Sequence, residues 1–161
     1  MKVDYKVMNV SDGKKYAGDL FSDAFKSEIP NFPLHFVLLL KIYQEYKTVG
    51  YVHYSKYNEN SYLCGGLVVN ANIFRKLDKE QRNFIKNKGG FAEIILRESF
   101  ESLKPFDVIW GYVGDKLAEK VDLRVGFEKT HKKFIMAVWG KYYSNNEKIK
   151  LVDEVFKIGP F

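Results

Sequence analysis

The sequence predicts an α/β fold of the mixed α+β kind, with helices on the faces of a mixed sheet. Three observations lead to this prediction. Stretches of alternating β-branched and aromatic residues occur in both halves of the chain, and stretches with helical spacing of apolar residues lie between them. At 161 residues and 46% hydrophobic content, the chain can bury one core. Without an internal repeat or a Pro/Gly/Ser-rich linker, we expect a single domain over residues 1–161.

The N-terminal segment predicts a strand followed by a helix. Residues 3–10 alternate weakly between apolar and polar side chains, as an opening strand does. Ser11 or Asp12 is a suitable N-cap for a helix through residues 14–29. Pro30 then ends this helix and begins a loop.

Three strands of a meander are expected next. Residues 34–46 are dense in Val, Leu, Ile, Phe and Tyr and predict one long strand. Residues 48–57 alternate β-branched and aromatic side chains and predict the second strand. The loop Asn-Glu-Asn-Ser separates it from the third, residues 62–69, so the three strands should run antiparallel.

The second half begins with helices and ends with strands. Residues 72–87 predict a basic amphipathic helix, and Gly89-Gly90 separates it from a more apolar helix over residues 91–103. Further along the chain, the pattern predicts elements in the following order: a strand at 108–113, a helix at 115–125, a hairpin at 127–140, and surface-attached structure of unassigned type at 144–161.

The composition limits the class of protein and its location. Lys and Arg together number 26 against 20 acids, giving a net charge of +6, and direct nucleic-acid binding would account for this charge. An A/T-rich coding bias toward Lys would account for it equally, since only four of the 26 are Arg. A single cysteine, Cys64, excludes a disulfide framework. The longest apolar run is too short to span a membrane and no secretory signal is visible, so we expect a cytoplasmic protein without membrane contact.

The segment Asn-Lys-Gly-Gly-Phe-Ala at residues 87–92 is a candidate anion site. Its two glycines allow close backbone approach, and the helix that follows presents free N–H groups at its positive end. The alternative is that the glycines simply cap or kink a helix.

Residues 108–139, taken with the segments above, resemble the GNAT superfamily of acyl-CoA-dependent N-acyltransferases over about residues 3–140. The family often reads N-x-x-A-x-x-x-Y-x-x-x-G-F in its C-terminal half. The matching positions in this chain are Asp115, Ala118, Asp122, Gly126 and Phe127. The sequence of this block, together with the preceding GGLVV and GGFAE segments, looks like that of GNAT-like proteins encoded by bacteriophages.

The resemblance implies a GNAT-like fold with a mostly antiparallel sheet, helices on both faces and acetyl-CoA, or another acyl-CoA, as cofactor. The family strand that pairs with the pantetheine arm is matched by Leu67, Val68 and Val69. The family loop that wraps the pyrophosphate is matched at Asn87, Gly90 and Ala92, which brings Lys88, Gly89 and Phe91 into the same loop. An acyl thioester would then lie in a cleft between the Leu67–Val69 strand and the 108–113 strand.

Catalytic residues are less well defined, because Asp122 stands where many members have the Tyr that protonates the leaving thiolate. An Asp is ionised at neutral pH unless it is buried. His53 could deprotonate an amine, and Tyr112 could replace the missing acid; packing roles are the alternative for both. Cys64 is expected to be an inert buried thiol rather than an acyl relay. The three scattered histidines have no metal-ligand spacing.

We therefore expect an acetyl-CoA-dependent N-acyltransferase whose amine acceptor is a small molecule, a protein or a modified nucleic acid. The alternative is a catalytically degenerate GNAT-fold binding protein, such as a phage factor that engages a host protein or nucleic acid. A phage-encoded chain would act in the host cytoplasm.

Overall fold

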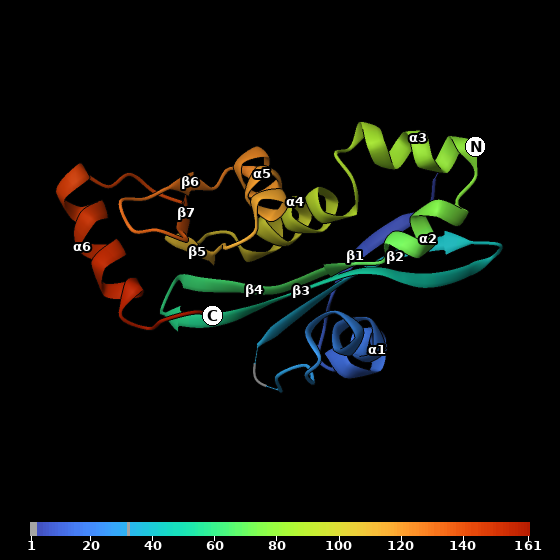
Figure 1. Cartoon of the computed structure of the whole chain (residues 1–161), viewed down its shortest axis with the longest axis horizontal. Helices are drawn as coiled ribbons and strands as arrows, with labels where there is room; N and C mark the ends of the chain where they lie inside the picture. The colour runs from blue at the N-terminus through green and yellow to red at the C-terminus, as the bar shows by residue number, and fades with distance from the viewer. Residues whose placement is uncertain (1–2, 32) are drawn as a thin grey trace. The chain divides into compact units, whose positions relative to one another are not determined.

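The computed structural model describes residues 3–31 and 33–161 (Figure 1). The helices and strands formed by these residues are, in chain order, β1 (Tyr5–Val10), α1 (Gly13–Phe25), β2 (Leu34–Ile42), β3 (Glu45–Asn58), β4 (Ser61–Val69), α2 (Ala71–Lys76), α3 (Lys79–Asn87), α4 (Phe91–Leu103), β5 (Val108–Tyr112), α5 (Lys116–Val125), β6 (Glu128–Lys129), β7 (Ile135–Trp139) and α6 (Asn145–Phe156).

The strands form one sheet in the order β1-β2-β3-β4-β5-β7-β6. β1 pairs antiparallel with β2, and β7 pairs antiparallel with both β5 and β6, whereas β4 and β5 are parallel. The predicted mixed, mostly antiparallel sheet with helices is thus confirmed. Contacts within the chain define two compact units: unit 1 comprises Met1–His53 and Gly66–Ser102, and unit 2 comprises Tyr54–Gly65 and Leu103–Phe161.

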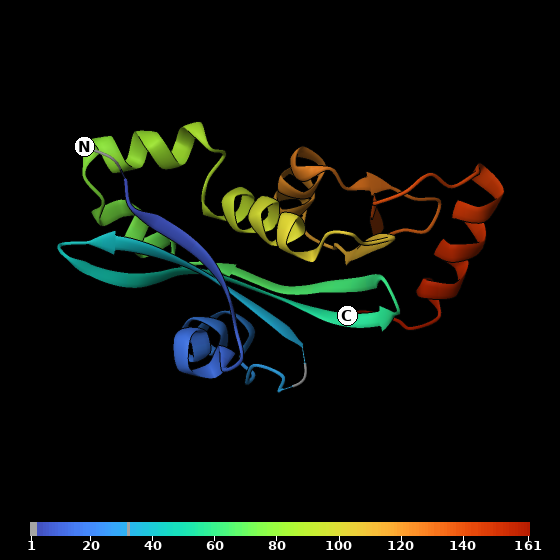
Figure 2. The same ribbon diagram turned by 180° about the vertical axis from the view of Figure 1, so that it is seen from behind.

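In unit 1, α1 lies on one face of the strands, and α2, α3 and α4 lie on the other (Figures 1 and 2). Helix α1 begins after Asp12, whose carboxylate accepts a hydrogen bond from the Lys15 N–H at 3.0 Å. A core of buried residues joins α1 to the strands through Ala17, Phe21, Ile29, Val37, Leu39 and Tyr51. Burial of the apolar stripe of α1 fixes its position on this face.

Two predicted elements of unit 1 were wrong, and each contains a break. The strand expected over 34–46 ends at Ile42, because Tyr43 and Gln44 adopt left-handed φ values of 50° and 75° and turn the chain into β3. The helix expected over 72–87 is two helices. The Asp78 side chain accepts from the Gln81 N–H at 2.7 Å, and this N-cap begins α3 separately from α2.

The helix predicted over 14–29 is shorter than expected. It ends at Phe25, well before Pro30, because Lys26 has a left-handed φ of 55° and donates its N–H to the Ser22 carbonyl. The helices predicted at 91–103 and 115–125 are confirmed as α4 and α5, which differ from the predicted bounds by at most one residue.

In unit 2, the segment left unassigned at 144–161 contains α6. Ser144 and Glu147 form a capping box at its start, with reciprocal hydrogen bonds of 3.3 and 2.7 Å. Val152 and Val155 of α6 are buried in the core of this unit, with Val108, Trp110, Ile135 and Ala137. Helix α6 is therefore part of the packed structure of unit 2.

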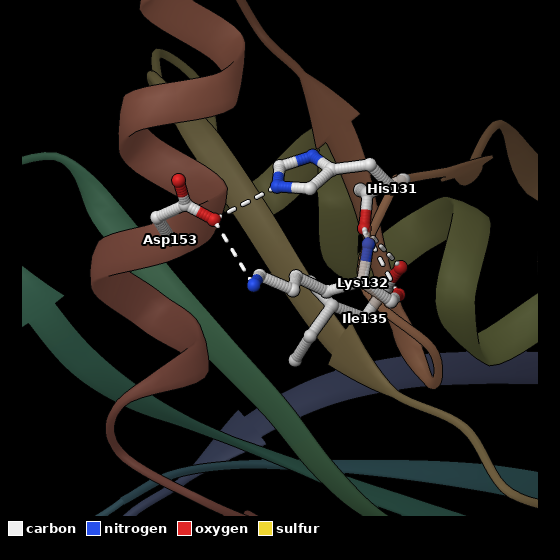
Figure 3. A network of polar contacts seen from close by, with 5 residues as sticks. His131, Lys132, Ile135 and Asp153 are labelled. Carbon is white, nitrogen blue, oxygen red and sulfur yellow. Dashed lines mark hydrogen bonds and ion pairs between the residues drawn. The ribbon is translucent and has the colours of Figure 1, made fainter.

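Polar contacts with Asp153 hold the loop between β6 and β7 against α6 (Figure 3). One Asp153 oxygen lies 2.8 Å from Nε2 of His131 and 3.5 Å from Nζ of Lys132. The Thr130 hydroxyl donates to the Ile135 carbonyl at 2.9 Å and closes the loop. Within the described residues, no helix combines the length and the apolar character needed to cross a membrane.

Candidate functional site

His53, the predicted base, lies on β3 of unit 1 and is half-buried. Its imidazole lies against the backbone of Gly66 on β4, where φ is +63°, and a β-carbon at Gly66 would overlap the ring. The ring of Phe21 from α1 has its centroid 5.9 Å from that of His53. Glycine at position 66 thus allows the imidazole to lie directly beside the strand.

Gly66 immediately precedes Leu67, Val68 and Val69, the residues that the resemblance assigns to the pantetheine arm. All three are half-buried at the end of β4. β4 pairs with β5 over Ser61–Cys64, so Leu67–Val69 follow the paired stretch. The predicted base and the predicted cofactor strand are therefore neighbours in unit 1.

His53 belongs to a chain of three polar rings that the sequence did not reveal. The Tyr51 hydroxyl lies 3.3 Å from Nδ1 of His53 and 2.7 Å from Nδ1 of His35 on β2. Tyr51 is fully buried and His35 is 3% exposed. The neighbouring Pro33 suggests a surface position for His35. The packing of β2 beside β3 instead brings His35 into contact with Tyr51.

Burial governs the protonation of this group. It lowers the pKa of His53 to about 4, with a further decrease from the nearby His35. It also lowers the pKa of His35, although the Asp12 carboxylate partly offsets that effect. The pKa of Tyr51 is raised by burial. At neutral pH the three groups are therefore uncharged, and His53 has a lone pair to accept a proton.

The predicted phosphate loop forms the junction between α3 and α4. Gly89 and Gly90 have φ values of 88° and 99°. The N–H groups of Lys88, Gly89 and Gly90 donate to carbonyls of the last turn of α3 at 2.9–3.2 Å, so these glycines cap the helix. Any anion would be held by the first-turn N–H groups of α4, beginning at Phe91, which have no acceptor within that helix. A β-carbon at Gly90 would meet nothing within 4 Å, which leaves space for a ligand.

Other members of this loop have partners or surroundings of their own. Asn87 is the exposed last residue of α3, and Ala92 is half-buried in the first turn of α4. The Lys88 ammonium lies 5.7 Å from the ring centroid of Tyr5 and 5.4 Å from that of Phe84. Cation–π contacts of this kind hold it toward β1 and α3.

A buried carboxylate occupies the same helix terminus. Glu93 is 5% exposed and lies so close to Gly89 that a β-carbon there would overlap its carboxyl group. Its oxygen is 3.3 Å from the Arg97 guanidinium one turn later. Since an acidic group in the first turn is stabilised by the helix dipole, Glu93 uses part of the electrostatic attraction that a phosphate would need.

In unit 2, Asp122 on α5 is 7% exposed, and burial raises its pKa to about 7. Asp122 occupies the position where the family has its Tyr, and its burial is what allows an Asp to remain partly protonated near neutral pH. Burial is also the main cause that raises the pKa of the Cys64 thiol, followed by Asp122, while a hydrogen bond with Tyr54 acts in the opposite direction. Cys64 is half-buried rather than buried as expected. A thiol with a raised pKa is unreactive, which agrees with the inert role expected for it.

Tyr112, the other candidate acid, lies at the end of β5 and is half-buried. Its ring centroid is 5.6 Å from that of Phe134 and 5.9 Å from that of Phe161. These contacts belong to the aromatic packing around the unit 2 core. The role of Tyr112 as an acid stays a prediction. Its contacts with Phe134 and Phe161 are explained by packing alone.

Solved structures with similar folds include proteins named as GNAT proteins. An acetyltransferase of the GNAT family from Staphylococcus aureus Mu50 has a TM-score of 0.56 at 13% identity, covering 86% of this chain and 100% of that one. Escherichia coli ElaA has a TM-score of 0.50 at 11% identity, covering 84% and 97%. Apo FdhC, a nucleotide-linked sugar GNAT, has a TM-score of 0.50 at 12% identity, covering 96% of each chain.

No protein-family model matches the sequence, and no curated protein matches it. At such low identity the structural likeness establishes the fold and nothing finer. The chain has the fold of the GNAT-family acetyltransferases, as its sequence resemblance led us to expect.

Proposed function

We propose that this chain is an acyl-CoA-dependent N-acyltransferase, with acetyl-CoA as the expected donor and an amine as the acceptor. The observation that supports this most is the position of His53. Its imidazole lies against Gly66, directly before the strand segment assigned to the pantetheine arm, and it is uncharged at neutral pH. A neutral imidazole beside the donor strand has a free lone pair for the proton of an attacking amine, and its lowered pKa makes it a weak base that releases the proton readily.

Donor binding would use backbone groups of unit 1. The end of β4 from Leu67 to Val69 would hold the pantetheine arm, and the start of α4 at Phe91 and Ala92 would hold the pyrophosphate. Acyl-CoA would supply the activated thioester carbonyl. A fixed strand N–H near that carbonyl would stabilise the negative charge that develops on its oxygen during direct attack.

Proton transfer to the leaving thiolate requires a group that is protonated at neutral pH. Asp122 meets this requirement because burial raises its pKa to about 7, close to the value that favours acid catalysis near neutrality. We assign it the role that the resemblance gives to Tyr. The similarity to phage-encoded members leads us to propose a cytoplasmic site of action, within a bacterial host if the chain is phage-encoded.

A binding protein without catalysis is the second candidate, and Glu93 favours it. The Glu93 carboxylate lies at the helix terminus where the pyrophosphate would bind, and the glycine N–H groups are already used to cap α3. With a net charge of +6, such a protein would engage nucleic acid or a host protein.

Calorimetry with acetyl-CoA tests the proposal, with Gly90→Glu and Gly159→Glu as matched variants. Both positions have left-handed φ (99° and 83°) and open space around the β-carbon, so both variants carry similar strain and the same added charge. We expect micromolar to millimolar binding by the wild type and the Gly159 variant, and at least tenfold weaker binding by the Gly90 variant. Absence of binding at millimolar acetyl-CoA in the folded protein would overturn the proposal.

Release of free thiol from acetyl-CoA, followed with a lysine-containing peptide as amine probe, separates the two candidates. Amine-dependent thiol release supports the enzyme. Binding of acetyl-CoA without thiol release, or salt-sensitive DNA binding without acetyl-CoA binding, supports the binding protein.

A further inference from the structure

Two of the three linked rings in unit 1 have no part in the function proposed above. Tyr51 contacts Nδ1 of His53, and His35 contacts the same Tyr51 hydroxyl, in a continuous series of hydrogen bonds that runs from β3 to β2. Tyr51 is fully buried and His35 nearly so. Nonpolar side chains would fill these positions at lower desolvation cost, so the network calls for an explanation.

The single proton of the Tyr51 hydroxyl couples the tautomers of the two histidines. A phenol has one proton, so the Tyr51 hydroxyl donates to one Nδ1 and accepts from the other. The contact with His35 is short, at 2.7 Å, and the contact with His53 is long, at 3.3 Å. A relay starting at His53 requires that Tyr51 donates to Nδ1 of His35 and accepts from the Nδ1–H of His53. This tautomer leaves the lone pair of His53 on Nε2.

We propose that Tyr51 and His35 are positioning residues that form a proton relay behind His53, by which the proton that His53 takes from the acceptor is stored on His35. This inference rests on the proposed function, because it assigns His53 as the base for the amine. The tautomer that presents Nε2 to an amine is also the one in which the relay is ready to act.

The transfer balances in three linked steps. The acceptor ammonium gives its proton to Nε2 of His53, while the Nδ1 proton of His53 passes to the Tyr51 oxygen and the Tyr51 proton passes to Nδ1 of His35. Tyr51 remains a neutral phenol, His53 remains neutral with its proton on Nε2, and the positive charge is on His35. After the product leaves, the same transfers in reverse return the proton to solvent through His53.

Local electrostatics favour His35 as the storage site. The groups that bear on the pair are Tyr51, Asp12 and the two imidazoles themselves; Phe21 and Gly66, which also contact His53, do not titrate. Burial is the main cause that lowers the pKa of both imidazoles, and His35 lowers that of His53 further, whereas the Asp12 carboxylate acts in the opposite direction on His35. Moving the proton one residue inward therefore places the charge nearer its counterion.

Nitrogen-15 NMR of the histidine rings tests the network without any substrate. The chain has three histidines, so His35 and His53 are readily assigned. We expect the wild-type protein at neutral pH to carry the His53 proton on Nδ1 and the His35 proton on Nε2. His53 protonated on Nε2 would overturn the proposal, and this result requires no variant to fold.

Kinetics of Tyr51→Phe test the relay in the reaction. The phenyl ring keeps the packing, and we expect kcat for thiol release to fall about 10- to 100-fold with the KM for acetyl-CoA unchanged. Tyr46→Phe, which removes a hydroxyl that donates to Asp4 at 2.9 Å on the surface, should leave both constants unchanged. Equal kcat in wild type and Tyr51→Phe would overturn the relay alone. Failure of the wild type to bind acetyl-CoA would overturn the proposed function. The role of the relay in the reaction would then be overturned as well.

Discussion

Replacing Asp122 with asparagine should change how the stability of the protein depends on pH. In the unfolded chain this carboxyl ionises near its ordinary pKa of 3.8, but in the folded protein burial delays ionisation to about pH 7. Between these values the folded state holds a proton that the unfolded state has lost, so wild-type stability falls as pH rises. The interval is about three pH units, which at 1.36 kcal/mol each corresponds to about 4 kcal/mol.

The asparagine variant lacks this titration. We therefore expect the unfolding free energy of Asp122→Asn minus that of wild type to rise by about 4 kcal/mol from pH 4 to pH 8 and to be level above pH 8. His53 acts in the opposite sense. Its pKa is lowered to about 4, so it stabilises the fold above pH 6.5 and loses that contribution toward pH 4. Both proteins contain His53, and its contribution cancels in the difference.

Urea denaturation at several pH values measures this difference. Trp110 and Trp139, whose ring centroids are 5.4 Å apart in unit 2, report on the unit that contains Asp122. Asp23→Asn, at an exposed position on α1, is the control and should follow the wild-type profile. A stability difference for Asp122→Asn that stays constant from pH 4 to pH 8 would refute the assignment of a protonated Asp122 and remove its proposed role as acid.

Three further predictions concern the α3–α4 junction and α6. Gly90→Ala should destabilise the protein by about 1–2 kcal/mol from left-handed strain alone. Gly89→Ala should destabilise it by clearly more, because the added β-carbon also displaces the buried Glu93 carboxylate. The denaturant midpoints of the two variants measure this difference. Glu93→Gln should tighten acetyl-CoA binding about two- to fivefold in calorimetry, and unchanged or weaker binding would exclude the phosphate from this terminus. Val152→Ala should lower the free energy of unfolding by roughly 1.5–3 kcal/mol, because this side chain is buried. Ile149→Ala, at a position that is 47% exposed, should lower it by well under 1 kcal/mol. Equal losses would contradict the packing of α6.

The two units hold groups that suit a GNAT-fold enzyme and one group that opposes donor binding. In unit 2, burial raises the pKa of Asp122 to about 7, which suits an acid near neutral pH. In unit 1, burial lowers the pKa of His53 to about 4, which keeps the imidazole neutral but makes it a weaker base. Glu93, in contrast, places a negative charge where a phosphate would bind. The affinity for acetyl-CoA is therefore the measurement that most directly separates an enzyme from a binding protein.

Local signals in the sequence predicted most elements of the fold. Asp115 before α5 and Gly126 after it delimit that helix as predicted, with a side-chain cap of 2.9 Å at its start and a left-handed φ of 113° at its end. Failures occurred where a local signal was ambiguous. Tyr43 and Gln44 are not typical turn residues, so the break between β2 and β3 was missed, and Asp78 was taken as an interior residue of a single helix although it begins α3.

The sequence by itself predicted the fold class from the periodicity of its apolar residues, and it placed His53 on a strand as a candidate base. The donor segments are what its resemblance to the GNAT superfamily implies, and they stay a prediction. Periodicity, glycine placement and motif spacing are properties of neighbouring residues. Only the tertiary structure decided the environment of each group. Strand pairing brings His35, sixteen residues before Tyr51, within 2.7 Å of its hydroxyl, and burial changes the protonation of Asp122. Proton affinity depends on solvent access and on partners distant in the chain, and neither is visible in the sequence.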